Sequence, residues 1–93
     1  MPHSKPLQAM GKLKNHKDCV NSIAWAPHTN SHLCSVGDDS QAFIWDMHSF
    51  KEENYYPFLE YKAEDEISNL TWSVSQADWL SICYRENVQI LRL

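Results

Sequence analysis

The chain repeats its own apolar pattern at a spacing of 47 residues, and this repeat restricts the folds that it can adopt. After the second turn of the pattern the spacing falls to 46, as between Ile44 and Ile90, so the second copy is one residue shorter there. A fixed spacing of this length indicates stacked structural units of one kind. The other matching pairs are Val20 and Ile67, Ile23 and Leu70, Trp25 and Trp72, and Leu33 and Leu80.

The first copy, residues 19–46, consists of short apolar runs separated by turn-forming residues. None of the runs is long enough for a stable helix, and Pro27 and Gly37 stand between runs rather than inside them. Gly37 to Ser40 supplies the turn chemistry of a hairpin. The sequence therefore predicts a three-stranded antiparallel meander. Its strands are 20–25, 33–36 and 42–45.

Further strands are expected on both sides of this meander. Residues 7–13 are predicted to form a lone strand, and Pro57 to Tyr61 a short edge strand, because proline at a strand start removes no ladder hydrogen bond. Residues 48–56 have no clear period and are predicted as a loop. Residues 1–6 are expected to be disordered. The strands of the second copy are 67–72, 79–84 and 88–93.

The run Ala42-Phe43-Ile44-Trp45 is apolar on both faces of its strand. A half-exposed antiparallel strand would alternate polar and apolar residues, so this strand requires a covering layer on each side. Repeats of four short strands that cover one another are typical of propeller blades. We therefore predict an all-β fold of antiparallel four-stranded blades of a β-propeller, with about two blades and an incomplete ring.

Composition narrows the function classes. The 93 residues carry a formal charge of −4 and no basic tract, which argues against nucleic-acid binding. No apolar run approaches the ~18 residues of a membrane span. Three cysteines are simplest to explain in a reducing compartment. No glycine-rich oxyanion loop or strand-turn-helix elbow frames a nucleophile, so we expect no enzyme.

Several side chains nevertheless allow other readings. His16, Cys19, His32 and Cys34 offer four donors that zinc accepts, so a small zinc-binding module is an alternative. The competing interpretation is that they are structural strand residues, and we expect no metal and no cofactor. The other combinations considered are Cys83 or Ser35 with His16 or His32 for catalysis, Glu64-Asp65-Glu66 for calcium, and Asp38, Asp39 and Asp46 for acid–base chemistry.

The residues from His16 to Asp46 resemble a WD repeat. The family's Gly-His opening is Asn15-His16 here, and its terminal Trp-Asp is Trp45-Asp46. The resemblance implies a buried hydrogen-bond network in which Asp39 binds His16, His16 binds Ser35, and Ser35 binds Trp45. It also implies that residues 7–13 are the outer strand of a preceding blade, that 14–61 form a WD-repeat blade, and that 62–93 form a degenerate last blade without its fourth strand.

Within the WD-repeat family, residues 12–93 are similar to the C-terminal part of the AN-eleven type, the plant anthocyanin and trichome regulators and their animal counterparts that scaffold DYRK-class kinases. The similarity includes the Trp-Ala-Pro tripeptide and the Ile-Leu-Arg-Leu ending. It implies a cytoplasmic and nuclear adaptor that joins kinases with basic helix-loop-helix or MYB-type regulators. Animal members are also linked to cullin-four ligases, but the Trp-Asp-x-Arg docking signature is not met, because His48 stands at its last position.

The sequence does not decide the role of an aromatic group after the first repeat, or what completes the two repeats into a closed structure. Phe50, Tyr55, Tyr56 and Phe58 form an aromatic group that could bind a partner or seat a loop on the blade edge. Two repeats cannot close a ring, so the chain is expected to need missing propeller blades or to associate with itself. The alternative to an adaptor is a truncated structural remnant without an independent partner.

Overall fold

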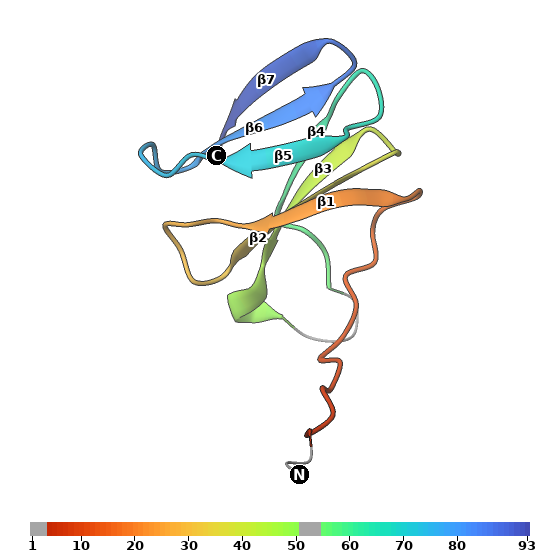
Figure 1. Cartoon of the computed structure of the whole chain (residues 1–93), viewed down its shortest axis with the longest axis vertical. Coiled ribbons are helices and arrows are strands. Elements are labelled where there is room, and N and C mark those ends of the chain that lie inside the picture. Colours follow the sequence, from red (N-terminus) through yellow and green to blue (C-terminus); the bar gives the residue numbers. More distant parts are fainter. Residues whose placement is uncertain (1–3, 51–54) are drawn as a thin grey trace.

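A computed structural model describes residues 4–50 and 55–93 of the chain (Figure 1). No helix in these residues is long and apolar enough to cross a membrane. The described elements are seven strands and one short 3-10 helix, η1. Their bounds are β1 Val20–Trp25, β2 His32–Gly37, β3 Gln41–Asp46, η1 Met47–Ser49, β4 Leu59–Lys62, β5 Asn69–Trp72, β6 Trp79–Tyr84 and β7 Asn87–Arg92.

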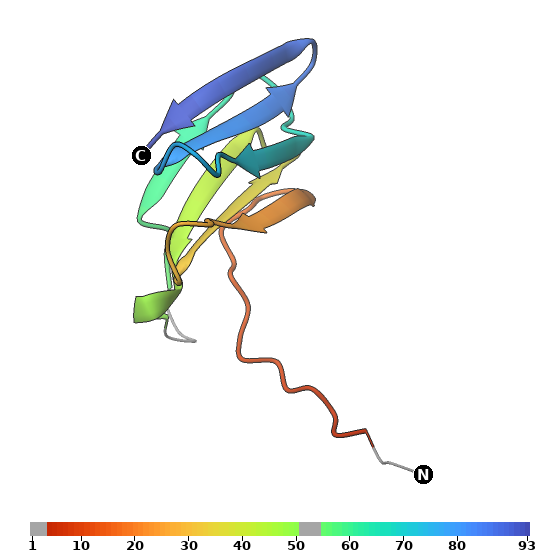
Figure 2. The ribbon, with the colours of Figure 1, turned by 60° about the vertical axis from the view of Figure 1, so that its left-hand side comes forward.

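The strands form two antiparallel sheets, and the second sheet repeats the first. The first sheet has the order β1-β2-β3-β4 and the second the order β5-β6-β7. The sheets lie one above the other, as Figure 2 shows. This arrangement confirms the prediction of all-β propeller blades in an open assembly: one blade has four strands and the other has three.

The two tight turns differ in length, as the change of spacing predicts. β2 and β3 are joined by three residues that end at Ser40, whose φ of 67° lies in the left-handed region. A left-handed third residue is the usual geometry of a three-residue hairpin loop. Only Arg85 and Glu86 separate β6 from β7, and Arg85 takes the left-handed conformation there, with a φ of 52°.

The main hydrophobic core lies between the two sheets. Cys34, Val36 and Ile44 of the first sheet belong to the same buried cluster as Leu70 and Ile82 of the second. Ile82 and Val36 are fully buried. Because an apolar face is stable only when another layer removes it from water, this contact fixes the two sheets against each other.

Polar contacts set the position of one sheet on the other. The Trp72 indole Nε1 donates to the Ala24 carbonyl at 3.0 Å. The pairing of β1 with β2 is irregular between Val20 and Ser22, where Asn21 lies. The side-chain Nδ2 of Asn21 donates to the Ile67 carbonyl at 2.8 Å. Such an irregularity turns a side chain toward a new partner, and here the partner belongs to the neighbouring blade.

The structure corrects several strand assignments. Residues 7–13 form no strand, because no other described strand lies beside them to take their backbone hydrogen bonds. β4 starts at Leu59 rather than Pro57 and continues to Lys62, so the first blade extends one residue past the expected boundary at 61. Of the start expected to be disordered, residues 1–3 lie outside the described part of the chain, and residues 4–6 are exposed.

The strands of the second blade are also shifted at their ends. β5 begins at Asn69, because the preceding Ile67 donates its N–H to the Gly37 carbonyl of the first sheet at 3.1 Å. β7 begins at Asn87 and ends at Arg92, one residue earlier than expected at each end. The segment predicted as a loop after β3 starts with the η1 turn, in which Asp46 accepts the N–H of His48 at 3.0 Å.

Each sheet buries one face against the other and leaves part of its second face open. The run Ala42–Trp45 is buried on both faces, as its composition predicts, with Ala42 and Ile44 in the main core and Phe43 and Trp45 in a second cluster. Ile23 and Trp25 of β1 remain exposed on the outward face of the first sheet. On the second sheet, Val88 and Ile90 of β7 are exposed. The reason is geometric, since none of the described strands packs over these outward faces.

We predict that Ile82→Ala lowers the free energy of unfolding by about 2–5 kcal/mol, because the deletion leaves a cavity between the sheets. Urea unfolding followed by tryptophan fluorescence measures the change. The control is Val74→Ala in the exposed turn before β6, which should shift stability by less than about 0.5 kcal/mol. Equal effects of the two substitutions would show that the sheets are not packed on each other.

Candidate functional site

The imidazole of His16 joins the connector before β1 to the first sheet. Its Nδ1 lies 3.0 and 2.9 Å from the two carboxylate oxygens of Asp39. Its Nε2 lies 2.7 Å from the Ser35 hydroxyl. Only about 6% of the His16 side chain and 7% of the Asp39 side chain are exposed. The connector is therefore held to the β2–β3 hairpin by one nearly buried ring.

Ser35 links His16 to Trp45 through hydrogen bonds of its hydroxyl group. The indole Nε1 of Trp45 donates to the Ser35 hydroxyl at 2.9 Å. Since an indole N–H can only donate, the hydroxyl accepts from it and can donate its own proton to His16 Nε2, which leaves Nδ1–H for Asp39. The structure thus brings the residues named from the WD-repeat resemblance into one continuous network that satisfies each of their buried polar groups.

The Asp39 carboxylate has more donors than its histidine. It accepts the backbone N–H of Lys17 at 3.0 Å and that of Gln41 at 3.2 Å. Burial by itself would raise the pKa of Asp39. The hydrogen bonds from Lys17, His16 and Gln41 favour the ionised form, and the pKa lies below its ordinary value of 3.8.

Gly37 makes room for this network. A Cβ at this position would lie 2.5 Å from the Cys19 carbonyl and 3.2 Å from His16 Nδ1 and Asp39 Oδ1. The close approach to the Cys19 backbone cannot be relieved by turning a side chain. The sequence pattern indicated Gly37 only as a turn former, and the packing against the connector appears only in three dimensions.

The Ser35-His16-Asp39 geometry resembles a hydrolytic triad, but its environment does not suit catalysis. Ser35 is 5% exposed, and its hydroxyl is already engaged by the Trp45 indole. A nucleophile needs an approach path for the substrate and an oxyanion site nearby. The arrangement is a structural clamp. Cys83 and His32 have no part in it.

The four residues considered for zinc do not converge. Both ring nitrogens of His16 are occupied in the network. Burial raises the pKa of the Cys34 thiol to about 12, so the thiolate that zinc requires is disfavoured. In the described part of the chain, the cluster of metal-ligating side chains is Asp18, Cys19 and Asp38 instead, and it is exposed at Asp18 and Cys19.

The acidic candidates have local partners. Asp65 accepts from Arg85 Nε at 2.6 Å on an exposed surface, and this hydrogen bond is the main cause that lowers the pKa of Asp65. Asp38 accepts from Asn21 Nδ2 at 2.6 Å. Asp46 caps the η1 turn. Asp38, Asp46 and Asp65 therefore hold turns and connectors in place.

The second blade replaces the polar network with apolar contacts. By the repeat spacing, Ala63 stands in the place of His16, Ile82 in that of Ser35, and Leu91 in that of Trp45. Ala63 and Ile82 are buried in the main core, and Leu91 packs against it. Replacing the histidine, the serine and the tryptophan of the network by apolar groups leaves no orphaned donor in the core, so the blade keeps its shape without the network.

The aromatic group expected after β3 divides into packed and exposed members. Tyr55 stacks on Trp45 with ring centroids 5.9 Å apart, and Phe50 meets Tyr55 edge-on at 5.2 Å. Tyr56 is 67% exposed. Phe58 is 48% exposed and lies 5.1 Å from the His32 ring. Residues 51–54 between them lie outside the described part of the chain.

Two stacked antiparallel sheets, with a buried His-Ser-Asp-Trp clamp in the first, have the form of WD-repeat blades of a β-propeller. No family model matches the sequence, and no solved structure matches it. Among curated proteins, the chain is 44% identical over 95% of its length to the DDB1- and CUL4-associated factor 7 homolog of Dictyostelium discoideum, of which it covers 27%.

Other relatives carry WD-repeat or transport names. An uncharacterised WD repeat-containing protein of Schizosaccharomyces pombe is 26% identical over 95% of the chain, which covers 30% of that protein. The protein transport protein SEC13-2 of Candida glabrata is 34% identical over 68% of the chain, which covers 22% of it. The chain thus spans less than a third of the length of these relatives.

Removing the carboxylate in Asp39→Ala should destabilise the chain by about 2–3 kcal/mol at pH 7, because His16 and two backbone N–H groups lose their acceptor. The pKa of Asp39 is lowered by folding, so its contribution is present above pH 3.8 and is lost as the pH falls through the lower native pKa. Urea midpoints of wild type and variant should therefore converge in acid. Glu64→Gln, on an exposed side chain, is the control and should not change this pH dependence.

Adding a methyl group in Gly37→Ala should destabilise the chain by more than about 1 kcal/mol, through the collision with the Cys19 carbonyl. Thermal unfolding measures the loss. The control is Lys12→Ala in the exposed arm before the connector, which should leave the melting temperature unchanged. A stable Gly37→Ala variant would mean that the connector does not pack on the hairpin in solution.

Proposed function

We propose that the chain is a non-enzymatic protein–protein interaction adaptor, the C-terminal portion of a propeller of the AN-eleven type. The observation that carries the proposal is the 44% identity, over nearly the whole chain, to a protein named as an associated factor of DDB1 and CUL4. The blade structure supports it, because the polar groups that could do chemistry are buried and already paired. What remains on the surface is suited to binding.

The binding surface that we propose is the exposed aromatic edge of the first blade. Tyr56 and Phe58 precede β4 and expose large apolar rings without a fold-stabilising stack on Trp45. Exposed aromatic residues are enriched among interface hot spots. Tyr55 stacks on Trp45 and Phe50 packs on Tyr55, so the hot-spot role falls to Tyr56 and Phe58.

The proposed partners rest on the resemblance to the AN-eleven type and on the net charge of the chain. DYRK-class kinases, basic helix-loop-helix factors and MYB-type regulators are the proposed ligands, and a cytoplasmic and nuclear location goes with them. The formal charge of −4 favours a basic partner surface. A cullin-four ligase adaptor is the partner that we consider least supported. The Trp-Asp-x-Arg docking signature lacks its arginine in this chain, because His48 occupies that position.

The proposal predicts that Tyr56→Ala combined with Phe58→Ala weakens binding of a DYRK-class kinase by about tenfold or more, because the exposed rings are removed. The melting temperature should change little. Surface plasmon resonance with the immobilised kinase, a basic helix-loop-helix factor and DDB1 in parallel measures the effect.

Val74→Ala, an exposed apolar side chain far from this edge in the sequence, is the control and should bind as wild type does. Absence of binding to all three proteins by a folded wild-type chain would refute the adaptor proposal and favour a structural remnant. Unchanged affinity of the double variant would refute the assigned surface alone.

A further inference from the structure

We propose that Tyr55 is a positioning residue of the partner-binding edge: it holds the exposed rings of Tyr56 and Phe58 in the conformation that a partner binds. Residues 55–58 form the edge segment. This inference rests on the proposed adaptor function, since it concerns the surface assigned there. It adds a role for Tyr55, whose own ring does not touch the partner.

The edge segment belongs to no helix or strand. The η1 turn ends at Ser49, and β4 begins at Leu59. Backbone outside a sheet has no ladder of hydrogen bonds to fix its dihedral angles, and each residue that must become ordered on binding lowers the affinity. Exposed rings on such a segment therefore make a good binding surface only where other contacts fix the backbone that carries them.

The first of these contacts is the stack of Tyr55 on Trp45. The two ring planes are inclined by 20°, with centroids 5.9 Å apart. Trp45 is fully buried, and its indole N–H donates to the Ser35 hydroxyl at 2.9 Å. A ring that is buried and hydrogen-bonded in this way keeps one orientation, so it gives Tyr55 a fixed support.

Two further groups hold the Tyr55 ring on this support. Phe50 meets it edge-on, with centroids 5.2 Å apart and ring planes at 70°. Aromatic pairs of this geometry are favourable beyond the apolar area that they bury. Burial and the nearby Asp46 carboxylate raise the pKa of the Tyr55 hydroxyl, so this hydroxyl lies close to the end of β3. Tyr55 is therefore packed, whereas the adjacent Tyr56 is 67% exposed.

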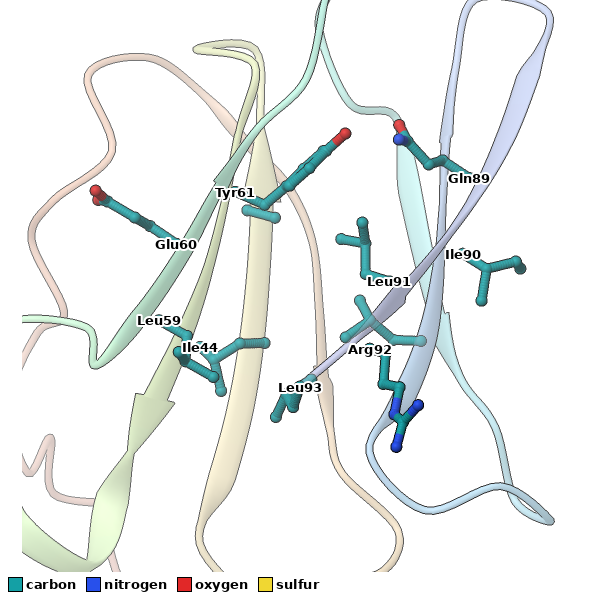
Figure 3. A pocket seen from close by; sticks show the side chains of 11 residues that line it. Ile44, Leu59, Glu60, Tyr61, Gln89, Ile90, Leu91, Arg92 and Leu93 are labelled. Carbon is teal, nitrogen blue, oxygen red and sulfur yellow. The ribbon is translucent and has the colours of Figure 1, made fainter.

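The C-terminal end of the edge segment is fixed by β3. The Phe58 N–H donates to the Ile44 carbonyl at 3.0 Å. The next residue, Leu59, is the cross-strand partner of Ile44, and both side chains line the apolar slot between the two sheets (Figure 3). The Phe58 ring also lies 5.1 Å from the ring of His32 on β2. The segment is thus attached to the first sheet at both of its ends.

Pro57 restricts the backbone between the two attachments. Its ring fixes its own φ at about −65°, and it disfavours the helical conformation for the preceding Tyr56. The Tyr56 ring takes part in none of the aromatic contacts among the described residues, so its neighbours decide its position. The edge segment therefore presents Tyr56 and Phe58 to a partner without further ordering.

A purely structural role for Tyr55 would have different consequences. Met47 of η1 packs against the same buried cluster as Tyr55 but lies outside the edge segment. If Tyr55 acted only by filling space, Tyr55→Ala and Met47→Ala would have the same effects. If Tyr55 positions the edge, both substitutions lower the stability, but only Tyr55→Ala releases Tyr56.

The first measurement needs no partner and is the 15N relaxation of the full 93-residue chain. The Tyr56 amide of the wild type should have an order parameter of about 0.85, the value of a rigid backbone, and Tyr55→Ala should lower it below about 0.6. Tyr55→Phe keeps the stacked ring and should retain the wild-type value, as should Met47→Ala. Pro57→Ala should lower the order parameter of Tyr56 as well, and it serves as the second variant should Tyr55→Ala fail to fold.

The second measurement follows binding to the immobilised DYRK-class kinase by surface plasmon resonance. Tyr55→Ala should weaken binding about tenfold, chiefly through slower association, because a mobile edge rarely has the binding conformation. Tyr55→Phe and Met47→Ala should bind as wild type does. Faster dissociation with unchanged association would show that the Tyr55 ring touches the partner, and would refute the positioning role.

A mobile Tyr56 amide in the wild type would overturn the inference, as would an ordered one in both Tyr55→Ala and Pro57→Ala. Equal effects of Tyr55→Ala and Met47→Ala on the order parameter would leave Tyr55 a packing residue only. The adaptor proposal fails separately, when a wild-type chain with an ordered edge binds neither the kinase, nor the basic helix-loop-helix factor, nor DDB1. The relaxation data decide in either case whether Tyr55 holds the edge.

Discussion

The structure depends on the burial of one face of each sheet against the other. A single four-stranded sheet has no way to remove both apolar faces of β3 from water, and the second sheet removes one of them. Val36 and Ile44 on one side and Leu70 and Ile82 on the other form this contact. Each further feature, from the bulge at Asn21 to the Trp72 indole bond, adjusts how one sheet lies on its neighbour.

The two blades differ in how they fill the buried space between their strands and the connector that precedes them. In the first, a ring nitrogen, a hydroxyl, a carboxylate and an indole are buried together, and each finds a partner within 3.0 Å. In the second, alanine, isoleucine and leucine occupy the equivalent positions and need no partners. Both solutions avoid an unpaired buried polar group, which is the costly case. The clamp therefore serves to hold the connector at His16 and is not needed for a blade as such.

Much of the architecture could be predicted from the sequence, because local chemistry decides it. Short apolar runs between Pro27 and Gly37 specify strands and turns, and the change of spacing from 47 to 46 correctly gives a shorter β6–β7 turn. The residues of the clamp were named through the Trp45-Asp46 and Asn15-His16 pattern. For Tyr55 the sequence left partner binding and packing on the blade edge equally open, because a sequence does not reveal that its ring stacks on Trp45.

The sequence by itself determined where the strands lie and the lengths of the tight turns, since these depend on neighbours along the chain, while the residues of the clamp were indicated only by the resemblance to a WD repeat. Tertiary structure alone decided that Gly37 must lack a side chain, that Ile67 bonds across to the first sheet, and that residues 7–13 remain without a strand partner. The physical reason is that each of these depends on a contact between segments distant in sequence, and a strand in particular exists only where another backbone lies beside it to accept its hydrogen bonds.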